Sequence, residues 1–117
     1  MDDILKLADD ISNAIKSSKI YQDYELAYNH IKSNKEIMNR VNQLKKSHLE
    51  FSRQYKSGNY DFNREKYLSQ EFYKAMLDED VKTYFMNEEK LVDLLSQVCY
   101  RMTNGCMLNV FTEENLW

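Results

Sequence analysis

The chain of 117 residues contains no proline and only two glycines. Strands and tight turns usually recruit both residue types, so their scarcity disfavours a β-rich fold and favours helices. Two cysteines are too few for a disulfide framework. No apolar run approaches the roughly 20 residues that span a bilayer. The acidic N-terminus, Met1-Asp2-Asp3, lacks the positive charge of a signal peptide. We therefore expect an all-α protein located in the cytoplasm, without a membrane partner.

Basic residues are also fewer than acidic ones. Lysine and arginine number 16 and aspartate and glutamate 19, which gives a net charge of −3. A nucleic-acid partner would favour a basic face, so direct nucleic-acid binding is not expected. The sequence also lacks a glycine-rich phosphate loop, a Gly-x-Ser-x-Gly elbow and a His-Glu-x-x-His motif. We predict that the protein is not an enzyme.

The stretch from Asn34 to Tyr55 carries the clearest pattern in the chain. Its apolar and aromatic residues recur at spacings of three and four, with a histidine in the one remaining slot: Ile37, Val41, Leu44, His48, Phe51 and Tyr55. This spacing predicts a helix of about 22 residues, roughly 33 Å long, with Asn34 as its N-cap. So narrow a seam is typical of coiled-coil packing, and we expect the other helices to lie along it.

Four further helices are predicted around this one. They span residues 3–17, 18–33, 64–77 and 78–103, with Gly58 and the residues up to 63 forming the one clear loop. The first of them has an apolar stripe within about 80° of the helical wheel: Ile4, Leu7, Ala8, Ile11 and Ile15. The predicted fold is an antiparallel helical hairpin or bundle of about five helices, two of them long. It forms a single domain over residues 1–117, with 104–117 as a short apolar tail.

The apolar residues of the last helix cover nearly half of its wheel, so this helix should contact more than one neighbour. Short neighbours within one subunit cannot cover two long helices. We therefore predict a homo-oligomer, at least a dimer, that associates through helix packing.

Few residues have the chemistry of a metal or catalytic site. His48 is interpreted as a half-buried seam residue. The carboxylates Glu50, Glu65, Glu71, Glu88 and Glu89 are interpreted as a solvated face, because no Glu-x-x-His motif accompanies them. Cys99 and Cys106 could ligate a metal, but a closed zinc or iron–sulfur site needs about four ligands. One chain would thus have to share the site with others. The simpler interpretation is a buried apolar Cys99 and a free thiol at Cys106.

Nine tyrosines are many for this length, and Tyr21, Tyr24 and Tyr28 lie on one predicted helix. They either form a protein interface or cover a small core with their hydroxyl groups in water. The tail, with Phe111 and Trp117, is too apolar for an ordinary disordered end. We expect it to dock in a groove between helices, in its own subunit or in a partner.

Two groups of residues suggest a family. The first half has a Ser-x-x-Tyr-x-x-Tyr signature at 18–24 within a helical pattern from Ala8 to Ile31. The second half has Asp-Glu-Asp-Val-x-x-Tyr-Phe at 78–85, followed by an apolar run at 91–98. Over residues 4–103 the chain resembles the YlbF/YmcA family of small helical bacterial proteins, the control-of-competence regulators.

The resemblance implies an all-α subunit that self-associates and joins related subunits in a cytoplasmic complex. It implies a regulatory adaptor for competence, sporulation and biofilm formation, linked to RNase Y and messenger-RNA maturation, without catalysis of its own. The family complex is associated with iron–sulfur clusters. The alternative function is therefore a redox sensor subunit whose cluster uses Cys99 and Cys106 from several chains.

Overall fold

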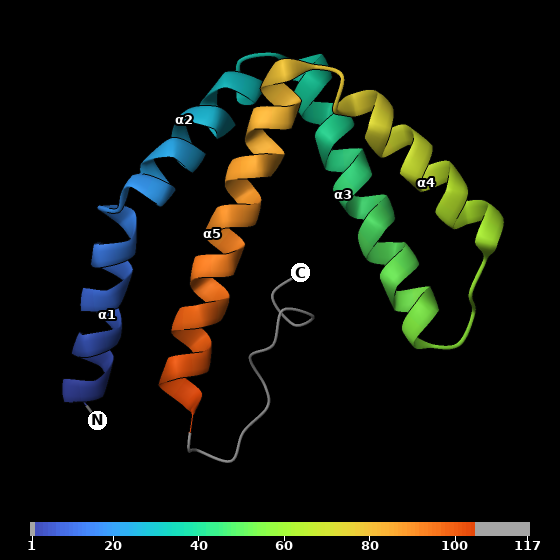
Figure 1. Cartoon of the computed structure of the whole chain (residues 1–117). Helices are drawn as coiled ribbons and strands as arrows, with labels where there is room; N and C mark the ends of the chain where they lie inside the picture. The colour runs from blue at the N-terminus through green and yellow to red at the C-terminus, as the bar shows by residue number, and fades with distance from the viewer. Residues whose placement is uncertain (1, 105–117) are drawn as a thin grey trace.

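The computed structural model describes residues 2–104, which form five α-helices (Figure 1). These are α1 (Asp2–Lys16), α2 (Lys19–Lys32), α3 (Lys35–Lys56), α4 (Phe62–Ala75) and α5 (Glu79–Thr103). The prediction of an all-α fold with two long helices is confirmed. The predicted helix ends agree within about two residues, the usual uncertainty of a helix boundary. The predicted tail beyond residue 104 lies outside the described residues.

Four of the helices have a polar N-cap residue. Ser18, Asn34, Asp61 and Asp78 each have extended backbone, and each accepts a backbone N–H from the first turn that follows. The Asn34 Oδ1, for example, accepts from Glu36 N at 3.1 Å and from Ile37 N at 3.3 Å. Such N-caps contribute about 1 kcal/mol each, because they satisfy N–H groups that have no partner within the helix. The sequence thus sets these boundaries locally.

The end of α3 depends on Gly58. Its φ of +88° lies in the left-handed region, which a glycine adopts without steric cost. The following Asn59 N–H then donates back to the Gln54 carbonyl at 2.8 Å. This closure reverses the chain and lets α4 return along α3.

The helices are arranged as an inverted V (Figure 1). Helix α2 packs against both α5 and α3, and α4 packs against α3. The ends of α2 and α4 and the starts of α3 and α5 meet at the apex. From there α3 and α4 form one leg, while α1 and the C-terminal half of α5 extend in the other.

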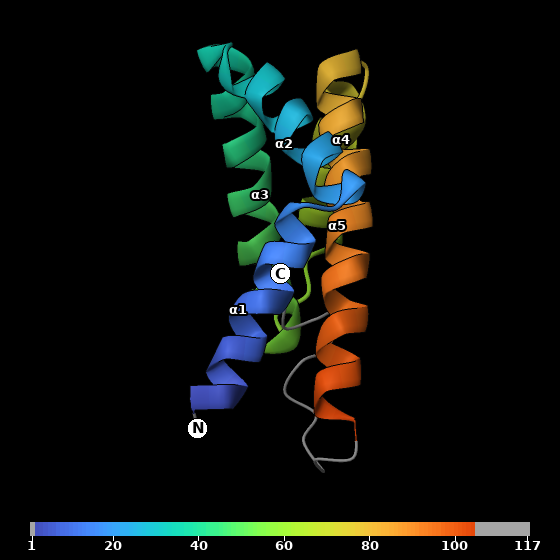
Figure 2. The same ribbon diagram turned by 90° about the vertical axis from the view of Figure 1, so that its left-hand side faces the viewer.

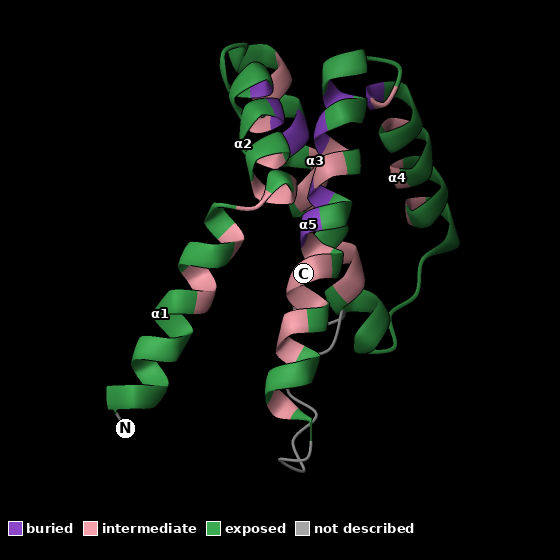
Figure 3. Cartoon of the chain, turned by 60° about the vertical axis from the view of Figure 1, so that its left-hand side comes forward, coloured by how far each residue is buried: buried purple, intermediate pink, exposed green. Residues whose placement is uncertain are grey.

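The buried core lies at this apex (Figure 3). Its residues are Ala27, Ile31, Val41, Ala75, Val81, Tyr84 and Leu91. Each of α2, α3, α4 and α5 contributes at least one of them, whereas α1 has no buried residue. The core is therefore small for a chain of this length. The legs extend away from it, and many of their apolar side chains remain exposed.

The apolar seam of α3 was predicted to be covered by other helices along its whole length, and this is confirmed only for its N-terminal half. Val41 is the one buried residue of α3, and Ile37 and Leu44 pack against the core. His48 is exposed, not half-buried as predicted, and Tyr55 is 61% exposed. The reason is that α5 packs on α2 instead of lying along the whole of α3. Among the described helices, α4 is the one that packs along the C-terminal half of α3.

The molecule is flat and extended. Its principal axes measure 48 × 38 × 17 Å, and the radius of gyration of its Cα atoms is 16.9 Å. A compact domain of this length has a radius of about 13 Å. The fold thus exposes more surface than a self-contained globule.

Candidate functional site

Helix α1 presents an apolar stripe that the described part of the chain, residues 2–104, leaves without a buried residue. Ile4 is 70% and Leu7 61% exposed, while Ile11 and Ile15 are half-buried. Spacings of three and four put all these side chains on one face. An exposed stripe of this kind is unusual for a helix that needs no partner, since amphipathic helices normally bury their apolar side.

The C-terminal half of α5 is also incompletely covered. Val92, Leu95, Val98 and Cys99 are half-buried, and Tyr100 is 64% exposed. In Figures 1 and 2 this half of α5 and the whole of α1 extend away from the apex toward the same end of the molecule. We call α1 and residues 92–103 of α5 the open leg.

A second group of exposed apolar residues lies on α4 and the turn after it. Phe62 is 65%, Tyr73 69% and Leu77 70% exposed. Another side of α4 packs on α5, where the centroid of the Phe72 ring lies 5.1 Å from that of the Phe85 ring. The molecule thus exposes apolar side chains in two separate regions, the open leg and the outer side of α4.

The tyrosines of α2 contribute to the core while remaining partly exposed. The rings of Tyr24 and Tyr28 lie 5.7 and 6.3 Å from the ring of Tyr84, and Tyr21 is 6.4 Å from Tyr24. All three α2 residues are half-buried. Of the two interpretations, the structure supports cover of a small core, at least for Tyr24 and Tyr28. Their role in an interface stays a prediction.

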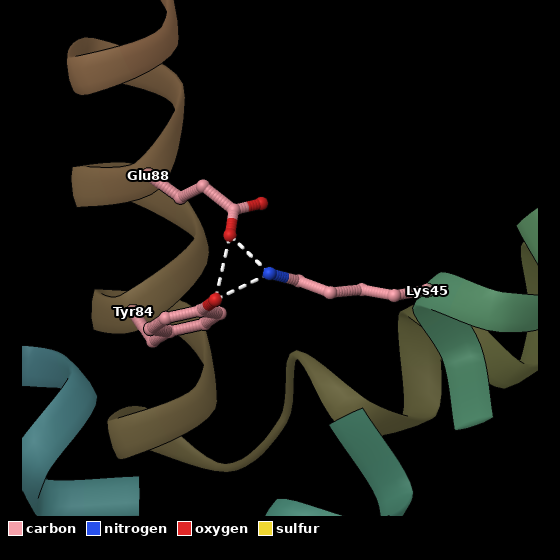
Figure 4. A network of polar contacts seen from close by, with 3 residues as sticks. All are labelled: Lys45, Tyr84 and Glu88. Carbon is pink, nitrogen blue, oxygen red and sulfur yellow. Dashed lines mark hydrogen bonds and ion pairs between the residues drawn. The ribbon is translucent and has the colours of Figure 1, made fainter. Parts of the chain in front are cut away.

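A buried polar network connects α3 to α5 (Figure 4). Tyr84 and Glu88 lie one turn apart on α5, and the Tyr84 hydroxyl donates to Glu88 Oε2 at 2.6 Å. The Lys45 ammonium, from α3, donates to the same carboxylate oxygen and to the Tyr84 hydroxyl. Its Nζ also lies 4.7 Å from the centroid of the Tyr84 ring, a cation–π distance. Lys45, Tyr84 and one oxygen of Glu88 thus form a closed triangle of hydrogen bonds between two helices.

Burial governs the electrostatics of this network. Tyr84 is 2% and Glu88 7% exposed. Burial, followed by the hydrogen bond to Glu88, raises the pKa of Tyr84 well above its ordinary value of 10.0. The phenol therefore stays a neutral donor, and Lys45 supplies the positive charge that the Glu88 carboxylate needs. Glu88 Oε1 is buried without a hydrogen-bond partner among the described residues.

The network is suited to holding the two legs together, because it joins a side chain of α3 to two side chains of α5. Two open hollows on the described surface are lined by other residues, of the α3–α4 loop and of α4. We interpret the network as a polar link between α3 and α5, which otherwise pack mainly on other helices.

Glu88 is a further residue whose environment was predicted wrongly from the sequence. It was grouped with solvent-facing carboxylates, yet it is buried. The signal was present, because Val81, Tyr84, Glu88 and Leu91 follow spacings of three, four and three, and the other three residues are buried. A charged residue within such a stripe indicates a buried ion pair, although its partner on α3 could not be named.

The predicted metal ligands are only partly within the described region. Cys99 is a free, half-buried thiol on the open leg, while Cys106 lies outside the described residues, as do Phe111 and Trp117. Within residues 2–104 there is no group of three or more histidine, cysteine, aspartate or glutamate side chains that could hold a metal ion. The shared cluster stays a prediction about an assembly.

Comparison with known families gave one result. Residues 4–105 match the sequence model of the family described as control of competence regulator ComK, YlbF/YmcA. This match covers most of the chain. The protein belongs to the YlbF/YmcA family. No match was found among curated proteins or among solved structures.

Membership in the YlbF/YmcA family confirms the resemblance noted from the sequence and supports a regulatory role. Among the described helices, none is both long and apolar enough to cross a membrane.

Proposed function

We propose that this YlbF-type protein is a non-enzymatic regulatory adaptor that acts in the cytoplasm through protein–protein contacts. The observation that carries the proposal is the exposure of apolar side chains in two separate regions, the open leg and the outer side of α4. An adaptor needs at least two surfaces, because it holds one protein near another. Apolar patches on a soluble domain commonly mark such contact sites.

The proposed partners are a second copy of the chain, related YlbF-type subunits and RNase Y. Homo-oligomerisation would cover one region and leave the other for a different protein. In this proposal the complex influences competence, sporulation and biofilm formation through RNase Y-dependent maturation of messenger RNA. The net charge of −3 supports an indirect role, in which RNase Y and not the adaptor contacts the RNA.

Affinity capture from the native cell, followed by mass spectrometry, tests this function. The tagged full chain should capture a YlbF-type protein, RNase Y or both, above the level of an untagged strain. A bait with Leu7→Glu and Leu77→Glu changes one exposed residue in each region and should lose these partners. The control bait carries Leu26→Glu, which changes a leucine of 60% exposure on α2 outside both regions, and should keep them. Failure of the unmodified bait to capture either protein would refute the proposed function.

A further inference from the structure

The outer side of α4 combines exposed apolar side chains with lysine. Phe62, Tyr73 and Leu77 are 65%, 69% and 70% exposed. At 100° per residue, these three positions and that of Lys66 fall within about 60° of the helical wheel. We call these four residues the α4 stripe. An open hollow on the same side of the helix is lined by Lys66, Ser69, Gln70, Tyr73 and Lys74.

The α4 stripe contains a positive charge and no carboxylate. The two glutamates of α4 lie outside its sector, and each has a partner: Glu65 accepts the Tyr60 hydroxyl, and Glu71 lies 3.4 Å from the Lys74 ammonium. Within residues 2–104, Lys66 makes no ion pair. Residues 62–77 contain three basic and two acidic side chains, which gives a local charge of +1 in a chain of net charge −3. The stripe is thus a positive and apolar surface on an acidic protein.

The stripe is accessible because the chain packs α4 through its other sides. Helix α4 packs on α3, and its one buried residue is Ala75. In Figure 1, α4 forms the outer edge of its leg, with α3 beside it. The Leu77 N–H donates to the Lys74 carbonyl at 3.2 Å, so the helical path continues to the end of the stripe. From Phe62 to Leu77 the stripe extends over about 22 Å.

An amphipathic helix is the element that suits such a surface. Leucine and aromatic side chains at helical spacing would pack on Phe62, Tyr73 and Leu77 over about four turns. Acidic residues beside that apolar face would meet Lys66 and Lys74, and such charge complementarity selects the correct partner and excludes basic ones. A single-stranded RNA suits the surface less well, because its phosphates require a row of cations along their path.

We propose that the α4 stripe docks an acidic amphipathic helix of a different protein. The inference rests on the proposed function, because it gives the chemistry of the partner at one of the two regions of the adaptor. It also explains why apolar residues and an unpaired lysine share one exposed face of α4.

Fluorescence anisotropy with the purified full chain and two synthetic peptides tests the docking. Each peptide has about four helical turns, with leucine and phenylalanine three and four positions apart on one face. The acidic peptide has glutamate at the flanking positions, and the control peptide has lysine there. The acidic peptide should bind about tenfold more tightly in 0.1 M salt. This difference should shrink in 1 M salt, where the Debye length falls from about 10 Å to about 3 Å.

Four variants of the full chain show whether the peptide binds on α4. Leu77→Glu and Lys66→Glu should each weaken binding of the acidic peptide about tenfold, because each places a negative charge on the stripe. Leu26→Glu is the matched control for Leu77→Glu, since Leu26 is 60% exposed on α2. Lys46→Glu, at an exposed lysine of α3, is the control for Lys66→Glu. Both controls should bind the peptide as the unmodified chain does, and circular dichroism checks that all four keep their helices.

Three results would assign the stripe to another occupant and overturn the proposal. Tighter binding of the acidic peptide after deletion of residues 105–117 would assign it to the tail of this chain. Loss of self-association in Leu77→Glu, measured by sedimentation equilibrium, would assign it to a second copy. Displacement of the peptide by a short oligouridine RNA would assign it to nucleic acid.

The proposal is also overturned if the acidic peptide does not bind, if both peptides bind equally, or if Leu77→Glu and Leu26→Glu have equal effects. These outcomes are distinguishable from failure of the proposed function. A chain that captures RNase Y but does not bind the acidic peptide contradicts only the docking. A chain that binds the peptide through the stripe, yet captures neither RNase Y nor a related subunit, contradicts only the adaptor role.

Discussion

Replacing Lys45 by methionine should destabilise the fold, because the buried Glu88 carboxylate would lose its counter-charge. The Glu88 carboxylate side chain is 9% exposed and that of Lys45 is 36% exposed. Methionine keeps much of the apolar stem but removes the ammonium that contacts Glu88 and Tyr84. The carboxylate then retains the Tyr84 hydroxyl as its one donor among the described residues, without a counter-charge.

The size of this effect lies between two limits. Removing one partner of a fully buried ion pair costs about 3–5 kcal/mol, whereas an exposed pair contributes about 0–1 kcal/mol. Because Glu88 is buried and Lys45 is about one-third exposed, we expect Lys45→Met to lower the free energy of unfolding by about 2–3 kcal/mol. Urea unfolding followed by circular dichroism at pH 7 measures this difference.

Two further variants make the test specific. Lys46→Met changes the adjacent, exposed lysine and should stay within about 0.5 kcal/mol of the unmodified protein. Glu88→Gln combined with Lys45→Met replaces the carboxylate by a neutral amide and should recover part of the loss, because no buried charge remains. Equal effects of Lys45→Met and Lys46→Met would refute the role assigned to the network. The role would also be refuted if the double variant lost as much free energy of unfolding as Lys45→Met and Glu88→Gln lose together when each is made alone.

Three other changes test the core, the network and the tail. Because the pKa of Tyr84 is raised, the stability it contributes is complete below pH 10 and is lost at higher pH. The unmodified chain should thus lose up to about 1.4 kcal/mol more per pH unit than Tyr84→Phe between pH 10 and 11, and parallel urea-unfolding profiles would contradict this. Ile31→Ala, at a fully buried site, should cost about 2–5 kcal/mol; the half-buried Leu44→Ala should cost less, and Lys35→Ala at most about 0.5 kcal/mol. Equal urea midpoints for the three would mean that the core is assigned wrongly. Deleting residues 105–117 should keep the helix content by circular dichroism and weaken self-association or partner capture, whereas unfolding would make the tail part of the core.

Local chemistry explains why the helices could be predicted well. Ser18, Asn34, Asp61 and Asp78 cap helix starts through hydrogen bonds to residues two or three positions away. Gly58 supplies the positive φ that ends α3. These interactions involve neighbours in the chain, so their residue types and spacing carry most of the information. The apolar stripe of α1 was also visible, since its period depends on one helix alone.

The choice of packing partners could not be predicted in the same way. The seam of α3 continues in sequence to Tyr55, yet burial is confined to its N-terminal half. Whether His48 is covered depends on where α5 runs, and α5 runs along α2. A stripe shows that a face is apolar, but it does not show which helix will cover it.

The helices, the reversal at Gly58 and the family could all be predicted from the amino-acid sequence, because each depends on local order or on a pattern along the chain. The confinement of the core to the apex and the contact of Lys45 with Tyr84 and Glu88, across about 40 residues, follow from how the helices pack. So does the absence of a buried residue on α1 among the described helices. Burial and ion pairing depend on distances between helices, and those distances are set by the packing of all of the helices together.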